Sequence, residues 1–322
     1  MDTMQTNHSP RDSDPSAILN FRGYRPLGIG DVLDVAVRLF RSRFVLFLGI
    51  VAAAQVPLLL AQGLLTYFSP ARALPPGLDN TALPPVFQSV FRGLLSLSSG
   101  GVSSTVLSIV AFLIDFLRNA AITLAASEVL MNRAMSVSQA YRRSLRYWFT
   151  ITLCTLLEVF FIGLLCIPGI LLGIIPIIGP LLAVIVIAVA LFFFLPRWMI
   201  SIPAIVAERV GPRKGLGRSW YLTGGRFWRV SGVWFFSSLL VFGISFAPTY
   251  LLFLIFVIVP DPKAAGLIYL TLSSILNIFF EPIAAIVAMV LYYDLRVRKE
   301  GFDIDMQSQA IQTEMALAAQ PA

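Results

Sequence analysis

Six long apolar stretches divide the chain, and its Lys and Arg residues collect in every second gap between them. A helix needs ~20 residues to cross a hydrocarbon core of ~30 Å, and only helices or closed barrels satisfy their backbone hydrogen bonds in lipid. Each stretch is long enough, so the sequence predicts an all-α integral membrane bundle of about six transmembrane helices. The stretches cover about 44–68, 104–126, 149–167, 177–200, 230–259 and 267–293.

The distribution of positive charge predicts an orientation. Alternate gaps, counted with the residues at their edges, hold 20 of the 24 Lys and Arg residues, and the other gaps hold 3. Because basic residues favour the cytoplasmic side, both termini are expected in the cytoplasm, as an even number of spans requires.

Composition excludes an ordinary soluble domain. Hydrophobic residues make up 57% of the chain and charged residues only 13%, far from the usual balance of globular proteins. The net charge of +7 could suggest nucleic acid, but the basic residues flank apolar spans. Anionic phospholipid head groups are therefore the expected partners, a protein partner remains possible, and nucleic acid is not expected.

The residues needed for common catalytic and metal sites are scarce. The single histidine, His8, lies in a polar N-terminal segment, and both cysteines, Cys154 and Cys166, lie in the third span. No Walker A loop, nucleophile elbow or paired-cysteine metal motif is present. We therefore predict no catalytic residue, no cofactor and no metal. Since the N-terminal segment lacks the apolar core of a signal peptide, the first span is expected to be an uncleaved anchor.

Three regions follow from this pattern. Residues 1–20 contain little apolar surface and are predicted to be a disordered tail. Residues 21–300 form the six-span membrane domain, and residues 301–322 form a C-terminal cytoplasmic tail. Between the first two spans, residues 86–95 have the spacing of a short amphipathic helix on the outer face. Residues 168–180, rich in Gly and Pro, predict a tight turn buried in the membrane, although Gly169 and Gly173 also match a helix-packing spacing.

Basic amphipathic segments precede alternate spans. Residues 27–44, 136–148 and 213–229 each combine basic side chains with apolar or aromatic ones. Such segments are typical of helices that lie in the membrane interface. They also suggest an internal repeat of three units, each an interfacial helix followed by a helical pair.

Several ionisable or amide side chains lie inside the predicted spans. A charge at a helix centre costs ~2.5–3.5 kcal/mol on insertion scales, so such residues are functional candidates. We hypothesise that they converge on one polar site inside the bundle. The alternative is structural: an ion pair three residues apart in the second span, and a bend at Pro282 in the sixth. The candidates are Asp115, Arg118, Asn119, Glu158, Asn277 and Glu281.

A second group of candidates is basic. Arginine offers a planar fork for phosphate, and tryptophan favours the head-group level, so a mixture of the two suits an anionic membrane surface. The alternative is that these charges only set topology. The candidate lipid contacts are Arg142, Arg143, Arg146, Arg218, Arg226 and Arg229.

The end of the last span carries the most specific motif in the chain, over residues 291–303. With residues 25–31 and 203–208, it resembles bacterial multi-pass proteins grouped with the membrane domain of glycerophosphoryl diester phosphodiesterase. The resemblance implies a bacterial cytoplasmic membrane protein. The phosphodiesterase barrel found in some members has no counterpart here, so the activity is not implied. The residues that carry the closing motif are Tyr293, Asp294, Arg296, Arg298, Glu300 and Gly301.

The sequence thus favours a non-catalytic scaffold or accessory subunit that engages anionic lipid or a partner protein. One alternative is a transporter or lipid flippase that uses the intramembrane carboxylates. A membrane-embedded lipid phosphodiesterase is the third reading, and it is the weakest because acid and base residues are few.

Overall fold

The computed structural model describes residues 27–68, 102–173, 175, 178–259 and 261–301. Over these residues the regular structure is entirely helical, and six helices are long and apolar enough to cross a membrane. The predicted all-α bundle of six spans is confirmed. The predicted tail at 1–20, the predicted tail at 301–322 apart from Gly301, and the predicted outer helix at 86–95 lie outside the described residues.

The helices vary from one turn to more than ten turns, with the longest at the C-terminal end. They are α1 (Ile29–Ser42), α2 (Phe44–Phe68), α4 (Val102–Leu130), α5 (Val137–Leu172), α6 (Gly179–Trp198), α7 (Ser201–Glu208), α8 (Pro212–Thr223), α9 (Phe227–Leu252), α10 (Ile255–Ile258) and α11 (Pro262–Glu300).

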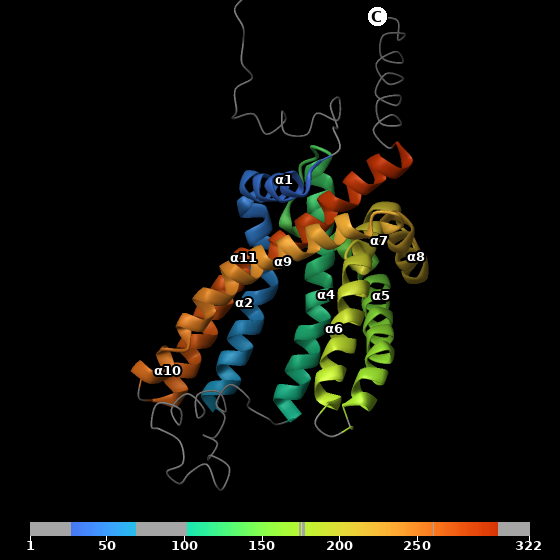
Figure 1. Ribbon diagram of the computed structural model, residues 1–322. Coiled ribbons are helices and arrows are strands. Elements are labelled where there is room, and N and C mark those ends of the chain that lie inside the picture. Colours follow the sequence, from blue (N-terminus) through green and yellow to red (C-terminus); the bar gives the residue numbers. More distant parts are fainter. Residues whose placement is uncertain (1–26, 69–101, 174, 176–177, 260, 302–322) are drawn as a thin grey trace, which may run out of the picture.

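The long helices form two leaning groups. Figure 1 shows α9 and α11 running side by side with α2 near them, while α4, α5 and α6 stand more upright on the other side. The short helices α1 and α8, the start of α5 and the C-terminal end of α11 all lie at the upper end in this view. We call this end the basic face, because it carries most of the described Lys and Arg residues.

The helix α1 lies across the bundle at the basic face (Figure 1). Its apolar stripe, which includes Val32, Val35, Ala36 and Leu39, is buried, and its main contacts are with α11. The amphipathic helix expected at 27–44 is therefore present, but its apolar side covers protein. Burial of these side chains stabilises the packed end of the bundle.

The second expected interfacial helix is not a separate element. Residues 136–148 form the beginning of α5, which continues without a break into the third span. Ser136 and Gln139 cap its start, and no proline occurs before Pro168, so nothing stops the helix at the predicted boundary. By contrast, Gly225 adopts φ +78° between α8 and α9, where the left-handed conformation ends one helix and allows another to begin. The predicted three-unit repeat therefore lacks its middle interfacial helix.

The core lies along the last third of α11. Leu291, Tyr292 and Tyr293 are almost fully buried there, and α11 contacts most of the other long helices. The α5 and α6 hairpin is the opposite case, because Phe160 and Val184 are 64% and 65% exposed. Such continuous apolar exposure is the surface expected of a helix pair that faces lipid.

The turn between α5 and α6 falls after Gly173, within the predicted range. Gly169 lies inside α5, however, and faces α6. A Cβ atom at Gly169 would lie 2.7 Å from Ile187 Cγ1 and 3.2 Å from the Ala183 carbonyl oxygen. Gly169 therefore permits close contact between the two helices of this hairpin.

Replacing Gly169 with alanine is expected to lower the free energy of unfolding by about 1–3 kcal/mol, because the added methyl group would force the hairpin apart. Denaturant titration in detergent measures the effect. Gly163→Ala, six residues earlier in α5, is the matched control, since a Cβ there meets nothing within 4 Å. Equal stability of the two variants would contradict the assigned role of Gly169.

Candidate functional site

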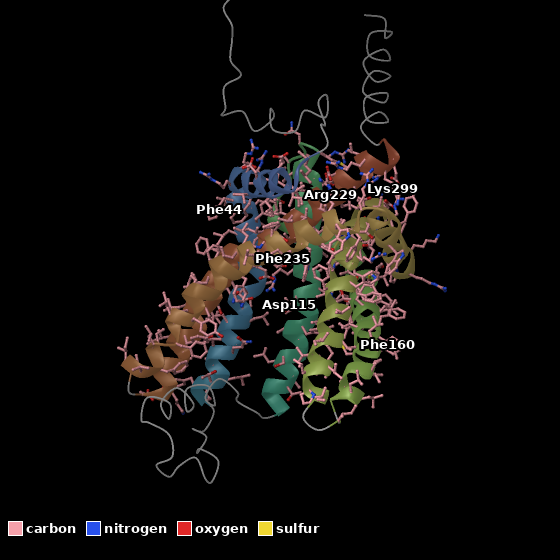
Figure 2. The ribbon with its side chains drawn as sticks, viewed as in Figure 1. Phe44, Asp115, Phe160, Arg229, Phe235 and Lys299 are labelled. Atoms are coloured by element: carbon pink, nitrogen blue, oxygen red, sulfur yellow. The ribbon has the colours of Figure 1, made fainter. Side chains whose placement is uncertain are left out.

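A buried arginine joins three of the long helices within the bundle. The Arg118 side chain is only 8% exposed, and its Nη1 donates to Gln55 Oε1 of α2 at 2.9 Å. Its Nη2 lies 2.9 Å from Asp115 Oδ1, one turn earlier in α4, and also pairs with Glu281 Oε1 of α11. Figure 2 shows Asp115 near the middle of the bundle. The cluster contains one cation and two carboxylates, so its carboxylates share a single guanidinium.

The remaining intramembrane candidates lie elsewhere. Glu158 of α5 accepts a hydrogen bond of 2.5 Å from Ser201 of α7, and the Cys154 thiol lies 3.6 Å from the same carboxylate oxygen. Asn119 and Asn277 are both exposed. The structure thus brings together Asp115, Arg118 and Glu281 from the predicted set and directs Glu158 to a separate contact between α5 and α7.

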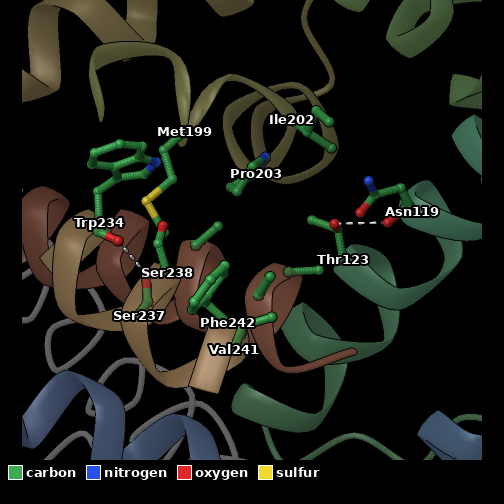
Figure 3. A pocket seen from close by; sticks show the side chains of 13 residues that line it. Asn119, Thr123, Met199, Ile202, Pro203, Trp234, Ser237, Ser238, Val241 and Phe242 are labelled. Carbon is green, nitrogen blue, oxygen red and sulfur yellow. Dashed lines mark hydrogen bonds between the residues drawn. The ribbon is translucent and has the colours of Figure 1, made fainter. Parts of the chain in front are cut away.

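A cavity of about 490 Å³ lies between α4, the α6–α7 junction, α9 and α11. Trp234 and Met199 close one side of it, and Asn119 and Thr123 of α4 lie across from them (Figure 3). The few polar groups are partly used within their own helices, since Thr123 Oγ1 donates to the Asn119 carbonyl and Ser237 Oγ donates to the Trp234 carbonyl. A mainly apolar cavity of this size is suited to an apolar ligand. Its other lining residues are Ile202, Pro203, Ser238, Val241, Phe242, Ala284, Ala285 and Ala288.

At the basic face, Asp294 of the closing motif joins α1, α9 and α11. The Asp294 side chain is 2% exposed and lies 2.8 Å from Arg229 Nη2 and 3.0 Å from Arg298 Nε. It also accepts the backbone N–H of Leu27 at 3.1 Å, just before α1. Both arginines donate to the Leu27 carbonyl as well. Asp294 therefore fixes the entry of α1 through bonds that are all charge-assisted.

A second ion-pair group extends this network to α7 and α8. Arg218 of α8 donates to Glu208 Oε1 of α7 and to Glu300 Oε2 of α11, both at 2.6 Å. Tyr292 donates to the same Glu208 oxygen at 2.7 Å, and Arg296 donates to Glu300 at 3.2 Å. Burial alone would lower the pKa of Arg218, but its hydrogen bonds to Glu300 and Glu208 and their negative charges outweigh burial and raise that pKa. Arg218 thus remains a cation in this position.

Smaller contacts complete the ends of the closing motif. Tyr293 shares a hydrogen bond of 3.0 Å with Ser127 of α4, and Arg226 donates to the Arg298 carbonyl at 3.1 Å. Gly301 adopts φ +63° and ends α11, as expected for a glycine at this helix position. The closing motif therefore docks α11 onto the neighbouring helices.

The predicted lipid-contacting arginines fall into two sets. Arg218, Arg226 and Arg229 donate hydrogen bonds to carboxylate or carbonyl oxygens of the protein. These bonds use N–H groups that a lipid phosphate would otherwise accept. Arg142 and Arg146 are exposed on the first turns of α5, whereas Arg143 is paired with Glu128 at 3.3 Å.

Three residues that contribute to these contacts were not predicted from the sequence. Gln55 accepts a hydrogen bond from Arg118. Glu208 accepts hydrogen bonds from Arg218 and Tyr292, and Arg197 contacts three aromatic rings. Gln55 offered a signal, because it is an amide inside an otherwise apolar span and such groups bond across helices. Glu208 lies within the 203–208 segment that carries part of the family resemblance, so its position was marked although its role was not.

Residues 170–315 match the family model of the membrane domain of glycerophosphoryl diester phosphodiesterase. The expected resemblance is confirmed. The match to this membrane-domain family includes the closing motif and residues 203–208. It begins after residues 25–31, so the resemblance of that N-terminal segment stays a prediction. No curated protein and no solved structure matches the chain.

In the matched segment, the conspicuous polar residues form contacts between helices. Within it, Arg218 on α8 pairs with Glu208 on α7 and with Glu300 on α11. Within the described residues, no cluster of three or more His, Cys, Asp or Glu residues could hold a metal ion. The segment thus supplies the helices and ion pairs that shape the basic face.

Proposed function

We propose that the protein is a non-catalytic membrane scaffold or accessory subunit that binds anionic phospholipid, and a partner protein, at its basic face. In this proposal the protein resides in the bacterial cytoplasmic membrane with the basic face in the cytoplasm. The main support for this proposal is that polar side chains within the bundle form ion pairs and hydrogen bonds with one another. Arg118 binds two carboxylates, and Glu158 is bonded by Ser201. These bonds tie helices to one another, which is the role of a fixed framework.

The lipid part of the proposal rests on the exposed side chains of the basic face. Arg142 and Arg146 are exposed near the start of α5, with Phe149, 72% exposed, one turn below. Trp228, at the start of α9, is 78% exposed. Basic residues beside exposed aromatic rings suit the head-group region of an anionic leaflet, where each cation contributes about 1 kcal/mol of attraction.

The double substitution Arg142→Gln and Arg146→Gln is expected to reduce the anionic phospholipid that co-purifies with the protein by about half or more, because two exposed cations are lost. Lipid extraction followed by mass spectrometry, with anionic lipid expressed relative to zwitterionic lipid, measures it. Lys263→Gln is the matched control, since Lys263 lies at the opposite end of α11. An unchanged ratio in the double variant would remove these residues from the proposal.

The cavity favours one competing function, transport of a lipid or another apolar molecule. Its walls come from α4, α7, α9 and α11, so movement between the two leaning groups of helices would change its shape. Transfer of a fluorescent phospholipid between leaflets of reconstituted vesicles distinguishes the two functions. The scaffold proposal predicts the same rate as in protein-free vesicles. A rate that increases with the amount of protein would establish transport instead.

A further inference from the structure

Arg197, near the end of α6, has surroundings unlike those of the arginines in the ion-pair network. Its guanidinium carbon lies 4.4 Å from the ring centre of Phe193 and 4.2 Å from that of Trp220. A third ring, Phe227, lies at 5.2 Å. The three rings come from α6, α8 and α9 and form an aromatic cage around one cation. Cation–π contacts of this kind stabilise a guanidinium without neutralising its charge.

No carboxylate pairs with Arg197 among the residues that the structure describes. Its Nε is buried and has no hydrogen-bond partner there. Arg218 and Arg229, in contrast, pair with Glu208 and Asp294 respectively. A guanidinium carries five N–H donors in its plane, and aromatic faces leave these donors without a strong acceptor. Arg197 is thus a cation at the edge of the membrane with donors to spare.

The cage is held in place by the protein. Ser219 of α8 donates to the Arg197 carbonyl oxygen, which ties α8 to the end of α6. A Cβ atom at Gly215 would lie 2.4 Å from Ile205 Cγ1, so α8 also packs closely on α7. Because Trp220 projects from α8, these contacts fix its ring beside Arg197. A pre-positioned cation loses little freedom when an anion binds.

The cage also lies at the correct level for a lipid head group. Arg197 lies in the last turn of α6, at its basic-face end, and Phe193 and Trp220 are 38% and 41% exposed. The exposed Trp228 is in ring contact with Phe227, at 5.5 Å between centres. Aromatic side chains gather at the membrane–water interface, where lipid phosphates lie.

We propose that the Arg197 cage is a binding site for one phosphate oxyanion, supplied by the head group of an anionic phospholipid or by free phosphate. Arg197 donates hydrogen bonds to the phosphate oxygens, and Phe193, Trp220 and Phe227 hold the guanidinium in position. The proposal rests on the proposed lipid binding at the basic face but assigns it one defined site, separate from the exposed Arg142 and Arg146.

Native mass spectrometry of the purified protein, titrated with phosphatidylglycerol in mild detergent, tests this site. The wild-type protein is expected to bind one lipid more tightly than all others, and Arg197→Gln is expected to weaken this binding about tenfold. Arg197→Lys keeps the charge but loses the planar fork, so intermediate binding is expected. Arg41→Gln, an equal loss of charge at an exposed position of the basic face, should leave the tight lipid in place.

A second experiment distinguishes lipid phosphate from free phosphate. It also tests the site if the protein binds no lipid. Millimolar inorganic phosphate is added without lipid, and the melting temperature is recorded for wild type and both Arg197 variants. Stabilisation of wild type and not of Arg197→Gln would assign the site to free phosphate, even if no lipid binds. Tight lipid binding by wild type in the first experiment, with no stabilisation by phosphate in the second, would assign it to a phospholipid. Equal behaviour of wild type, Arg197→Gln and Arg197→Lys in both experiments would overturn the site.

Discussion

Replacing Arg118 with leucine is expected to lower the free energy of unfolding by about 3–5 kcal/mol, the range for removing one partner of a buried ion pair. The loss leaves Glu281 of α11 without its cation and Gln55 of α2 without its donor. Asp115, 49% exposed, is affected less. Reversible unfolding in mixed micelles, monitored by circular dichroism, measures the change.

Two further variants separate the ion pair from simple loss of packing. If the uncompensated carboxylate causes the damage, Arg118→Leu combined with Glu281→Gln should be more stable than Arg118→Leu alone. Arg38→Leu is the matched control, since Arg38 and Asp34 form an exposed pair with side chains 52% and 58% exposed, and exposed pairs contribute only about 0–1 kcal/mol. A loss in Arg118→Leu no larger than in Arg38→Leu would contradict the role given to Arg118.

The second large effect is expected at the basic face. Asp294→Asn should lower the free energy of unfolding by about 3 kcal/mol, near the lower end of the range for a broken buried pair. The carboxylate is 2% exposed, but Arg229 and Arg298 are each 20% exposed, so water can relieve part of their unpaired charge. The same unfolding experiment measures the loss.

The position of this damage is also predicted. Because Asp294 accepts the Leu27 N–H, the substitution should loosen α1 before the rest of the bundle opens. Hydrogen exchange should therefore rise over Ile29–Ser42 and remain slow in the core of α11. Asp34→Asn, on the exposed side of α1, is the control. Uniform exchange across both helices in the Asp294 variant would show that this residue does not hold α1 in place.

The six spans could be predicted from the sequence because their signal is local. Length and apolar composition decide whether a segment crosses a membrane, and both can be counted directly. The boundary within 136–148 was wrong for an equally local reason. The basic residues there suggested a separate interfacial helix, yet neither proline nor a pair of glycines interrupts α5 at that place, whereas Gly224 and Gly225 do separate α8 from α9.

The partners of the polar residues were less predictable. When a helix is apolar on all sides, its sequence does not show which side faces which neighbouring helix. The spacing of Asp115 and Arg118 indicated their pairing within one helix, but the contacts of Arg118 with Gln55 and Glu281 depend on how three helices pack. Similarly, the sequence marked Glu158 as intramembrane without indicating Ser201 as its donor.

The basic residues show the same limit. Arg218 and Arg229 have the composition expected of lipid contacts, and only the fold reveals that Glu208, Glu300 and Asp294 lie against them. Charge clusters in the sequence therefore identified the basic face as a whole. They could not separate the arginines that stabilise it from those left available to a ligand.

Native mass spectrometry of the wild-type protein, released from membranes in mild detergent without added lipid, tests the scaffold proposal most directly. We expect a stoichiometric complex that retains anionic phospholipid, a second protein, or both. Bare protein, with neither component at a fixed ratio, would contradict the proposal and reduce the basic face to a signal for membrane orientation.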